Sequence, residues 1–162
     1  MNRHIAIYPG SFDPFTNGHL DIVHRGLEIF EKVIIAVASN SEKSGFFTVQ
    51  ERVDLINQLV ADNPRVQVDA FEGLLVDYVV RKESRVILRG LRAVTDFEFE
   101  FQLAQMNHTV CEKVETLFMM TSPECAYLSS SIVKEVGRLG GDISKFVPPQ
   151  VLQALQNKFA EK

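Results

Sequence analysis

The chain has 162 residues, of which 46% are hydrophobic and 23% charged, and its formal net charge at pH 7 is -4. These values are typical of one globular domain and exclude a disordered chain. The net negative charge provides no overall positive surface for binding DNA or RNA. No apolar run approaches the roughly 18 residues of a membrane span. The N-terminal residues contain no long apolar core of a signal peptide, so we expect a cytoplasmic protein without nucleic-acid or membrane partners.

Strand-like apolar runs alternate with helical patterns along the chain. The second run, KVIIAVAS, is apolar almost throughout, which favours a parallel strand covered on both faces. Regular alternation of this kind predicts an α/β fold with a parallel sheet and right-handed crossovers, formed by residues 1–162 as a single domain. The strands are expected near residues 4–8, 32–39, 65–71, 86–89 and 116–121.

The segments between these runs show apolar residues at helical spacing. The first helix is expected from about residue 18 to residue 30, with Asn17 as its N-cap. The second begins at Thr48, because Thr48 and Glu51 match a capping box. Four more helices are expected over about 74–82, over about 96–110, from 130 to the Gly140–Gly141 pair, and after Pro148–Pro149.

The segment DFEFEFQLAQM combines two patterns. Its alternating phenylalanines alone would suggest a strand, but a helix turns by about 100° per residue. Phe97 and Phe101 then share one face, while Phe99 and Met106 lie nearly opposite. A helix that is apolar on two faces is buried on two sides. We expect one side to meet the sheet and the other a second copy of the chain; the alternative is a helix deep in the core.

The first polar cluster follows the first strand. In IAIYPGSFDPFTNGHLDIV, the turn formers Pro9 and Gly10 lead to a helix whose first turn holds Gly18 and His19. Ligands of α/β sheets bind beyond the carboxyl ends of strands, and the free N–H groups of a helix start favour an anion. His19 is therefore a candidate phosphate contact, although a histidine that merely begins a helix would give the same pattern.

Two further clusters follow later strands. In ILRGLRAVTDFE, Arg89 and Arg92 suit bidentate phosphate binding, or they are solvated arginines paired with nearby acids. In YLSSSIVKEV, Ser129–Ser131 precede a helix, with Lys134 one turn in. The serines form either a second anion-binding site or an N-cap with more hydroxyl groups than capping requires. Because the carboxyl ends of parallel strands share one edge of a sheet, we expect all three clusters to meet there.

Several other kinds of site lack support. The sequence has neither GxGxxG nor GxxxxGK[ST], so nucleotide binding would use neither fingerprint. Cys111 and Cys125 are not spaced as a CxxC pair, and the four histidines are scattered, which argues against a structural metal site. Lys43, taken alone, has the pattern of an ordinary surface lysine.

At these residues the chain resembles the nucleotidylyltransferase superfamily. Thr16-Asn17-Gly18-His19 matches its T/HxGH motif, and LSSSIVKE matches its ISSSxxR/K motif with Leu128 in place of isoleucine. The block RGLRAVTDFEFEFQLAQMN is narrower and resembles the bacterial phosphopantetheine adenylyltransferase family. The resemblance extends from about Ile5 to Phe159. It implies a Rossmann-like nucleotide-binding fold, a five-stranded parallel sheet with helices on both faces, assembled as a homohexamer.

The resemblance also implies a reaction. Members of the family transfer the adenylyl group of ATP to 4'-phosphopantetheine, giving dephospho-coenzyme A and pyrophosphate in the penultimate step of coenzyme A synthesis. Magnesium is the implied cofactor, with no protein ligand assigned, and coenzyme A is an implied feedback inhibitor. The alternatives are another adenylyl- or cytidylyltransferase of the superfamily, or a non-catalytic nucleotide sensor. A phosphate nucleophile is largely ionised at neutral pH, so no general base is expected.

The same resemblance assigns residues to roles. His19 would stabilise the transition state, and Lys43, Arg89 and Arg92 would supply positive charge. Cys125 stands where an aromatic residue is common, so its side chain is not expected to contribute in the family's usual way. The phosphopantetheine side is implied to comprise Ser11, Lys43, Leu75 and Arg89. The ATP side is implied to comprise Ser11, Phe12, His19, Gly90, Leu91, Arg92, Glu100, Cys125, Ala126, Tyr127, Leu128, Ser129, Ser130 and Ser131.

Overall fold

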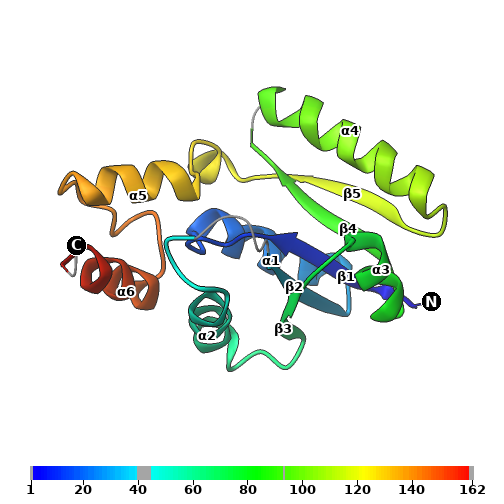
Figure 1. The fold of residues 1–162 in the computed structure, drawn as a ribbon, viewed down its shortest axis with the longest axis horizontal. Coiled ribbons are helices and arrows are strands. Elements are labelled where there is room, and N and C mark those ends of the chain that lie inside the picture. The colour runs from blue at the N-terminus through cyan, green and yellow to red at the C-terminus, as the bar shows by residue number, and fades with distance from the viewer. Residues whose placement is uncertain (1, 40–44, 93, 161–162) are drawn as a thin grey trace.

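The structure is a computed structural model that describes residues 2–39, 45–92 and 94–160 (Figure 1). All the predicted strands and helices are present, with ends shifted by one or two residues; a short 3-10 helix, η1, is additional. The elements are β1 (Asn2–Gly10), α1 (Asn17–Ile29), β2 (Lys32–Ala38), α2 (Val49–Val60), β3 (Val66–Phe71), α3 (Leu75–Arg81), β4 (Ser84–Leu91), α4 (Val94–Val110), β5 (Glu115–Met120), η1 (Pro123–Cys125), α5 (Ser130–Arg138) and α6 (Pro149–Ala160).

The strands form one parallel sheet in the order β3-β2-β1-β4-β5. The chain moves outward from the central β1 through β2 to β3, then crosses back to β4 on the other side of β1. This reversal between β1 and β4 is the topological switch point at which open α/β sheets bind ligands. The predicted Rossmann-like topology is confirmed, and the first polar cluster lies directly at the switch point.

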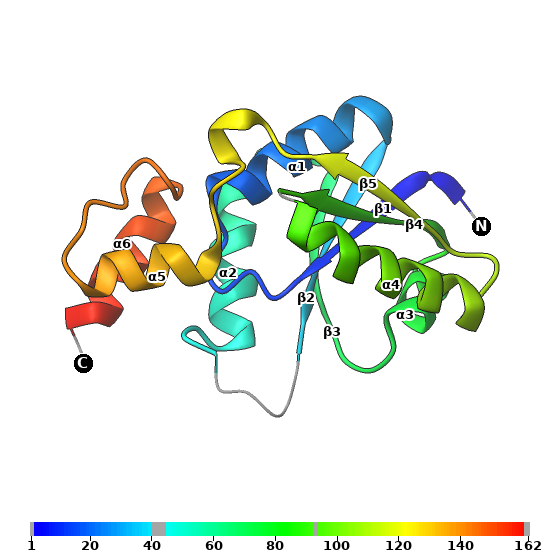
Figure 2. The ribbon, with the colours of Figure 1, turned by 90° about the horizontal axis from the view of Figure 1, so that it is seen from above.

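Helices cover both faces of the sheet, as predicted (Figures 1 and 2). On one face, Val23 of α1 and Ile56 of α2 join the larger core cluster, which Leu155 of α6 extends beyond the sheet. On the other face, Val76 and Val79 of α3 pack over the neighbouring strands. Burial of apolar surface from both faces explains why β2 is almost continuously hydrophobic.

The start of α1 differs from the prediction by one residue. Thr16, not Asn17, is the N-cap: its Oγ1 accepts the backbone N–H of His19, and its own backbone N–H donates to Nδ1 of His19. This is a capping box in which histidine takes the place of the usual glutamate or glutamine. Asn17 is instead the first residue of α1, and its backbone N–H donates to the carbonyl of the distant Phe146 at 2.9 Å.

Helix α4 lies along one side of the molecule (Figure 1). Several of its apolar side chains are exposed. Phe97 contacts Phe118 of β5, with ring centroids 6.2 Å apart, yet Phe97 remains 46% exposed. Phe99 and Met106, on the opposite side, are 65% and 62% exposed. A deep-core position is therefore wrong for the single chain, and burial against the sheet is only partial. The second copy expected on this surface stays a prediction.

Candidate functional site

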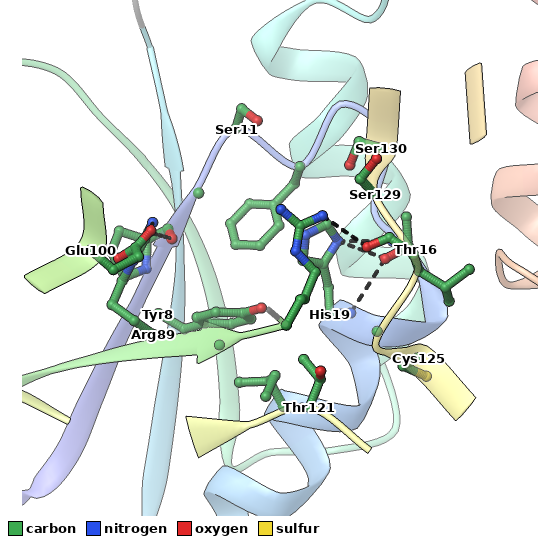
Figure 3. A pocket seen from close by; sticks show the side chains of 18 of the residues that line it. Tyr8, Ser11, Thr16, His19, Arg89, Glu100, Thr121, Cys125, Ser129 and Ser130 are labelled. Atoms are coloured by element: carbon green, nitrogen blue, oxygen red, sulfur yellow. Dashed lines mark hydrogen bonds and ion pairs between the residues drawn. The ribbon is translucent and has the colours of Figure 1, made fainter. Parts of the chain in front are cut away.

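A pocket of about 480 Å³ lies beyond the carboxyl ends of β1 and β4 (Figure 3). Its walls come from the loop after β1 and the start of α1, from the end of β4, from α4, and from the segment that joins β5 to α5. The three polar clusters named from the sequence all contribute residues to it. Their predicted convergence at one edge of the sheet is confirmed, because parallel strands direct all their carboxyl ends to the same side.

The capping box of α1 determines how His19 presents its ring. Thr16 donates its backbone N–H to Nδ1 of His19 at 3.0 Å, so Nδ1 must be an acceptor. In the neutral ring, the proton then resides on Nε2. The hydroxyl of Thr16 lies 3.1 Å from the same Nδ1 (Figure 3). His19 therefore offers one N–H donor through Nε2, fixed in orientation by the backbone of its own helix start.

The surroundings of His19 keep the ring neutral. The ring packs against Phe12 and Phe15, with centroids 5.1 and 5.3 Å away, and tilts against Tyr8 at 6.4 Å. Burial, reinforced by the positive charges of Arg92 and Arg89, lowers the pKa of His19 from 6.5 to about 3. At neutral pH the residue can donate a hydrogen bond but carries no charge.

Phe12 has an unusual backbone conformation at the pocket. Its φ angle is 49°, in the left-handed region that a bulky residue adopts at a cost of about 1–3 kcal/mol. The ring folds back over Gly10, where an added Cβ would lie 2.8 Å from the ring. Gly10, predicted as a turn former, is thus also required for the packing of Phe12.

Arg89 is held by two groups, the carboxylate of Glu100 and the carbonyl of Pro9. Its Nε donates to Glu100 at 2.7 Å, one Nη donates to the other carboxylate oxygen of Glu100, and the second Nη donates to the carbonyl of Pro9 at 2.8 Å. Burial would lower the pKa of Arg89, but the bonds and charge of Glu100 raise it. Arg89 is not a solvated arginine, because only 24% of its side chain is exposed. The resemblance assigned Arg89 and Glu100 to different ligands; the structure joins them as an ion pair.

The segment before α5 is fixed by hydrogen bonds from three directions. Arg92 donates to the carbonyl of Leu128 at 2.9 Å, and Ser129 caps α5 by accepting the N–H of Ile132 at 3.1 Å. Ser130 donates to the carbonyl of Pro14 at 2.7 Å. One serine thus caps the helix and another ties it to the loop after β1, which explains why a single cap serine would not suffice here.

Asp21 of α1 positions the other end of the same segment. Its carboxylate accepts the backbone N–H of Ser122 at 3.1 Å and its hydroxyl at 2.7 Å. This places η1, and with it Cys125, at the pocket. Burial, with the charges of Asp21 and Glu124, raises the pKa of the Cys125 thiol, so the sulfur is not an activated thiolate.

Most of the residues assigned from the sequence line this pocket, namely Ser11, Phe12, His19, Arg89, Gly90, Arg92, Glu100, Cys125, Leu128 and Ser129–Ser131. Among the described residues, Leu75, Leu91, Ala126 and Tyr127 are not part of its lining. Leu75 lies on α3 and packs against the core of the opposite sheet face. Lys43 lies outside the described residues.

Four pocket residues were not found from the sequence: Tyr8, Ile22, Phe99 and Thr121. Tyr8 looked like an ordinary strand residue, and Thr121 like the end of β5. A usable signal existed for both, since each stands at the carboxyl end of a strand beside the switch point. Phe99 gave no such signal, because its place at the pocket depends on how α4 packs after β4.

Comparison with known proteins agrees with this geometry. A cytidylyltransferase-like family model matches residues 7–136. A phosphopantetheine adenylyltransferase of Syntrophotalea carbinolica is 63% identical over 161 residues, covering 99% of this chain and 97% of the relative. One of Geobacter sulfurreducens is 61% identical over 160 residues, covering 99% and 98%.

A solved structure supports the fold. The "Putative Nicotinate-nucleotide Adenylyltransferase" from Vibrio parahaemolyticus superposes with a TM-score of 0.73 at 19% identity, covering 99% of this chain and 98% of the other. At that identity the likeness shows a shared fold alone. The sequence relatives carry the closer assignment, because their identity extends over nearly the whole chain. The chain therefore belongs to the phosphopantetheine adenylyltransferase family.

Proposed function

We propose that the chain transfers the adenylyl group of ATP to 4'-phosphopantetheine, producing dephospho-coenzyme A and pyrophosphate, a step of coenzyme A biosynthesis. The observation that carries this proposal is the high identity to phosphopantetheine adenylyltransferases along the full chain, 63% in one case. The pocket suits the reaction, because arginine, histidine and serine groups gather there on a parallel-sheet switch point.

The chemistry needs a positioned donor and no base. A phosphate oxygen of 4'-phosphopantetheine attacks the α-phosphorus of ATP, and the bond from that phosphorus to the oxygen bridging to the β-phosphate breaks, releasing pyrophosphate. The nucleophile is already ionised. We assign Nε2–H of His19 to an oxygen of the α-phosphate, where negative charge develops in the transition state. A neutral, pre-oriented donor needs no reorganisation when the reaction occurs.

The remaining charges bring two anions together. We assign Arg92 and Ser129–Ser131 to the ATP phosphates, with the N-terminus of α5 as the supporting dipole. Arg89 and Lys43 are assigned to the phosphate of 4'-phosphopantetheine, with Ser11 between the two ligands. Catalysis then depends on orientation and electrostatic stabilisation, as in other phosphoryl-group transfers.

We propose that magnesium is the cofactor and arrives with the nucleotide. Among residues 2–39, 45–92 and 94–160, no group of three or more His, Cys, Asp or Glu side chains could hold a metal ion. Magnesium keeps several waters and binds readily through substrate phosphates. The described residues therefore contain no site that could hold magnesium by a cluster of protein side chains alone, and we assign no protein ligand to the ion.

Assembly, regulation and location extend the same proposal. The exposed apolar side chains of α4 support a homo-oligomer, for which we propose a hexamer, and coenzyme A would compete for the phosphopantetheine side of the pocket. In the described part of the chain, every helix is too short or too polar to cross a bilayer. We propose the cytoplasm as the site of action.

The decisive assay supplies ATP and 4'-phosphopantetheine with magnesium and detects dephospho-coenzyme A by mass together with pyrophosphate. Nicotinamide mononucleotide as acceptor and CTP as donor serve as matched alternatives. Formation of dephospho-coenzyme A when ATP is the donor, without comparable transfer when CTP is the donor, supports the proposal. Faster turnover with either alternative would assign another transferase activity, and nucleotide binding without any turnover would assign a sensor.

A further inference from the structure

We propose that Asp13 and Lys134 are positioning residues for the transfer reaction. Their ion pair joins the loop after β1 to the first turns of α5, and so holds His19 and Ser129–Ser131 in register across the pocket. The inference rests on the proposed function, because its kinetic test needs the reaction. Neither Asp13 nor Lys134 is among the described residues that line the pocket.

The carboxylate of Asp13 accepts three hydrogen bonds. Oδ2 accepts from Nζ of Lys134 at 3.0 Å and from the backbone N–H of Phe46 at 2.8 Å, and Oδ1 accepts from the N–H of Phe47 at 2.8 Å. Asp13 as a whole is 8% exposed. Burial alone would raise its pKa, but the bonds from Phe47, Phe46 and Lys134 lower it, so the group stays charged at neutral pH.

These bonds connect three segments that are distant in sequence. Asp13 lies between β1 and α1, Lys134 lies on α5, and Phe46–Phe47 lead into α2. Neighbouring contacts hold the same loop: Ser130 donates to the carbonyl of Pro14, and Arg52 of α2 donates to the carbonyl of Ser11, each at 2.7 Å. Asp13 is the only one of these loop residues whose side chain carries a charge that both flanking segments use.

This arrangement assigns Lys134 an indirect role. Lys134 is the cation of the ISSSxxR/K motif, and the simplest expectation is direct contact with a nucleotide phosphate. Here its ammonium group is committed to a carboxylate, with 21% of the lysine side chain and 11% of the Asp13 side chain exposed. The pair acts through the relative placement of the two anion-binding segments. A displacement of about 1 Å between reacting groups can cost about 10²-fold in rate.

The kinetic test replaces each partner. Lys134→Met keeps most of the apolar stem and removes the charge, and we expect kcat to fall by about 10- to 100-fold. Lys134→Arg should recover most of the activity, because guanidinium can pair with the same carboxylate. Asp13→Asn should lower kcat at least as much, because an asparagine has one acceptor oxygen and also weakens the bonds from Phe46 and Phe47. The double variant should be no worse than Asp13→Asn alone, because both remove the same ion pair.

A second ion pair supplies the matched control. Lys158 of α6 donates to Glu51 of α2 at 2.6 Å, and 20% of the lysine side chain is exposed. Neither residue lines the pocket. Lys158→Met should leave kcat within about twofold, because this pair joins α6 to α2 and not the two segments that carry His19 and Ser129–Ser131. The proposal fails if, in both Lys158→Met and Lys134→Met, the loss of activity is proportional to the decrease in melting temperature. The pair of Asp13 and Lys134 would then only stabilise the fold.

Hydrogen exchange tests the pair without catalysis. The amides of Phe46 and Phe47 should exchange several-fold faster in Lys134→Met than in the wild type. Lys158→Met is no control for this readout, because Nζ of Lys158 lies 4.8 Å from the centroid of the Phe47 ring. Lys82→Met, which breaks the ion pair of Lys82 with Asp69 of β3, should leave exchange of both amides normal. A wild type without transferase activity would remove the proposed function but leave this result valid. Unchanged exchange with unchanged kcat would overturn the positioning role. So would a loss of ATP affinity in Lys134→Met that Asp13→Asn does not share, because Lys134 would then bind nucleotide directly.

Discussion

The backbone N–H of Thr16 donates to Nδ1 of His19 at 3.0 Å, so the bond that completes the cap of α1 also sets the tautomer of the pocket histidine. A proton on Nδ1 would break this bond. The helix start and the orientation of the donor are therefore one local structure. This explains how a four-residue motif can specify a chemical group so closely: the threonine and the histidine contact each other before any distant residue is needed.

Replacement of His19 by alanine should reduce kcat by about 10²–10³-fold, the usual effect of removing one transition-state donor. The variant should still fold. Because His19 takes part in the cap, we expect the free energy of unfolding to fall by about 1 kcal/mol, measured by urea denaturation.

A second capping box provides the comparison for His19→Ala. Thr48 and Glu51 form the same arrangement at the start of α2, away from the pocket lining. Thr48→Ala should also lose about 1 kcal/mol of stability while kcat stays near the wild-type value. Near-normal turnover in folded His19→Ala would refute the catalytic assignment.

Stability should depend on pH through His19. Its folded pKa of about 3 lies below the ordinary value of 6.5, so between these values the unfolded chain binds more protons. This contribution is fully present above pH 6.5 and is lost as the pH falls, by at most about 1.4 kcal/mol per pH unit. Solvent at the open edge of the pocket reduces that figure.

Urea denaturation between pH 7.5 and pH 5 measures this slope. His19→Gln should flatten it. The lowered pKa values of Asp13 and Asp21 act only at lower pH, since both carboxyls start from an ordinary value of 3.8. Equal slopes in wild type and variant would show that His19 titrates normally in the folded protein.

Loss of Arg89 should affect one substrate more than the other. Arg89→Ala is combined with Glu100→Gln, so that no buried carboxylate is left unpaired. The double variant should raise KM for 4'-phosphopantetheine by about 10- to 100-fold, which corresponds to the loss of one or two charge-assisted hydrogen bonds. KM for ATP should change less. Glu100→Gln alone is the control, and equal increases for both substrates would contradict the assigned division between them.

Gly10→Ala should disturb the pocket through Phe12. The added Cβ would lie 2.8 Å from the Phe12 ring, an overpacking that typically costs about 1–3 kcal/mol. Since the same ring packs against His19, kcat should fall as well. Gly18→Ala is the comparison for stability: its Cβ would lie 3.6 Å from that of Cys125, an ordinary contact, so thermal denaturation should show little change. Equal melting temperatures for both variants would disprove this account.

The apolar surface of α4 should control assembly. The wild type is expected to form an oligomer, and Phe99→Glu with Met106→Glu should shift it toward monomers, because charges would replace side chains that are 65% and 62% exposed in the single chain. Size exclusion with light scattering measures the mass. Leu139→Glu, which places a charge at an apolar residue that is 81% exposed at the C-cap of α5, should leave the mass unchanged. A monomeric wild type would exclude the proposed assembly.

Local patterns determined much of this protein. Strand and helix alternation predicted the sheet and its layers, and the capping box of Thr48 and Glu51 was found where expected. The three clusters were predicted to converge, because strand ends in a parallel sheet lie on one side. Each of these inferences depends on neighbours within about one helical turn or on a general rule of topology. The prediction of Asn17 as the N-cap was wrong. The N-cap is Thr16, because the side chain of His19, three residues later, completes a capping box with it.

The tertiary structure alone decided how the charged groups pair. Arg89 could have faced several acids, and packing of α4 selected Glu100. Lys134 finds Asp13 across 121 positions of sequence, and Tyr8 and Phe99 enter the pocket only because distant segments close around them. Charge interactions are not periodic, so sequence spacing does not record them. The sequence by itself established the fold and the candidate chemistry, while the folded chain determined which side chains are committed to one another and which point to a ligand.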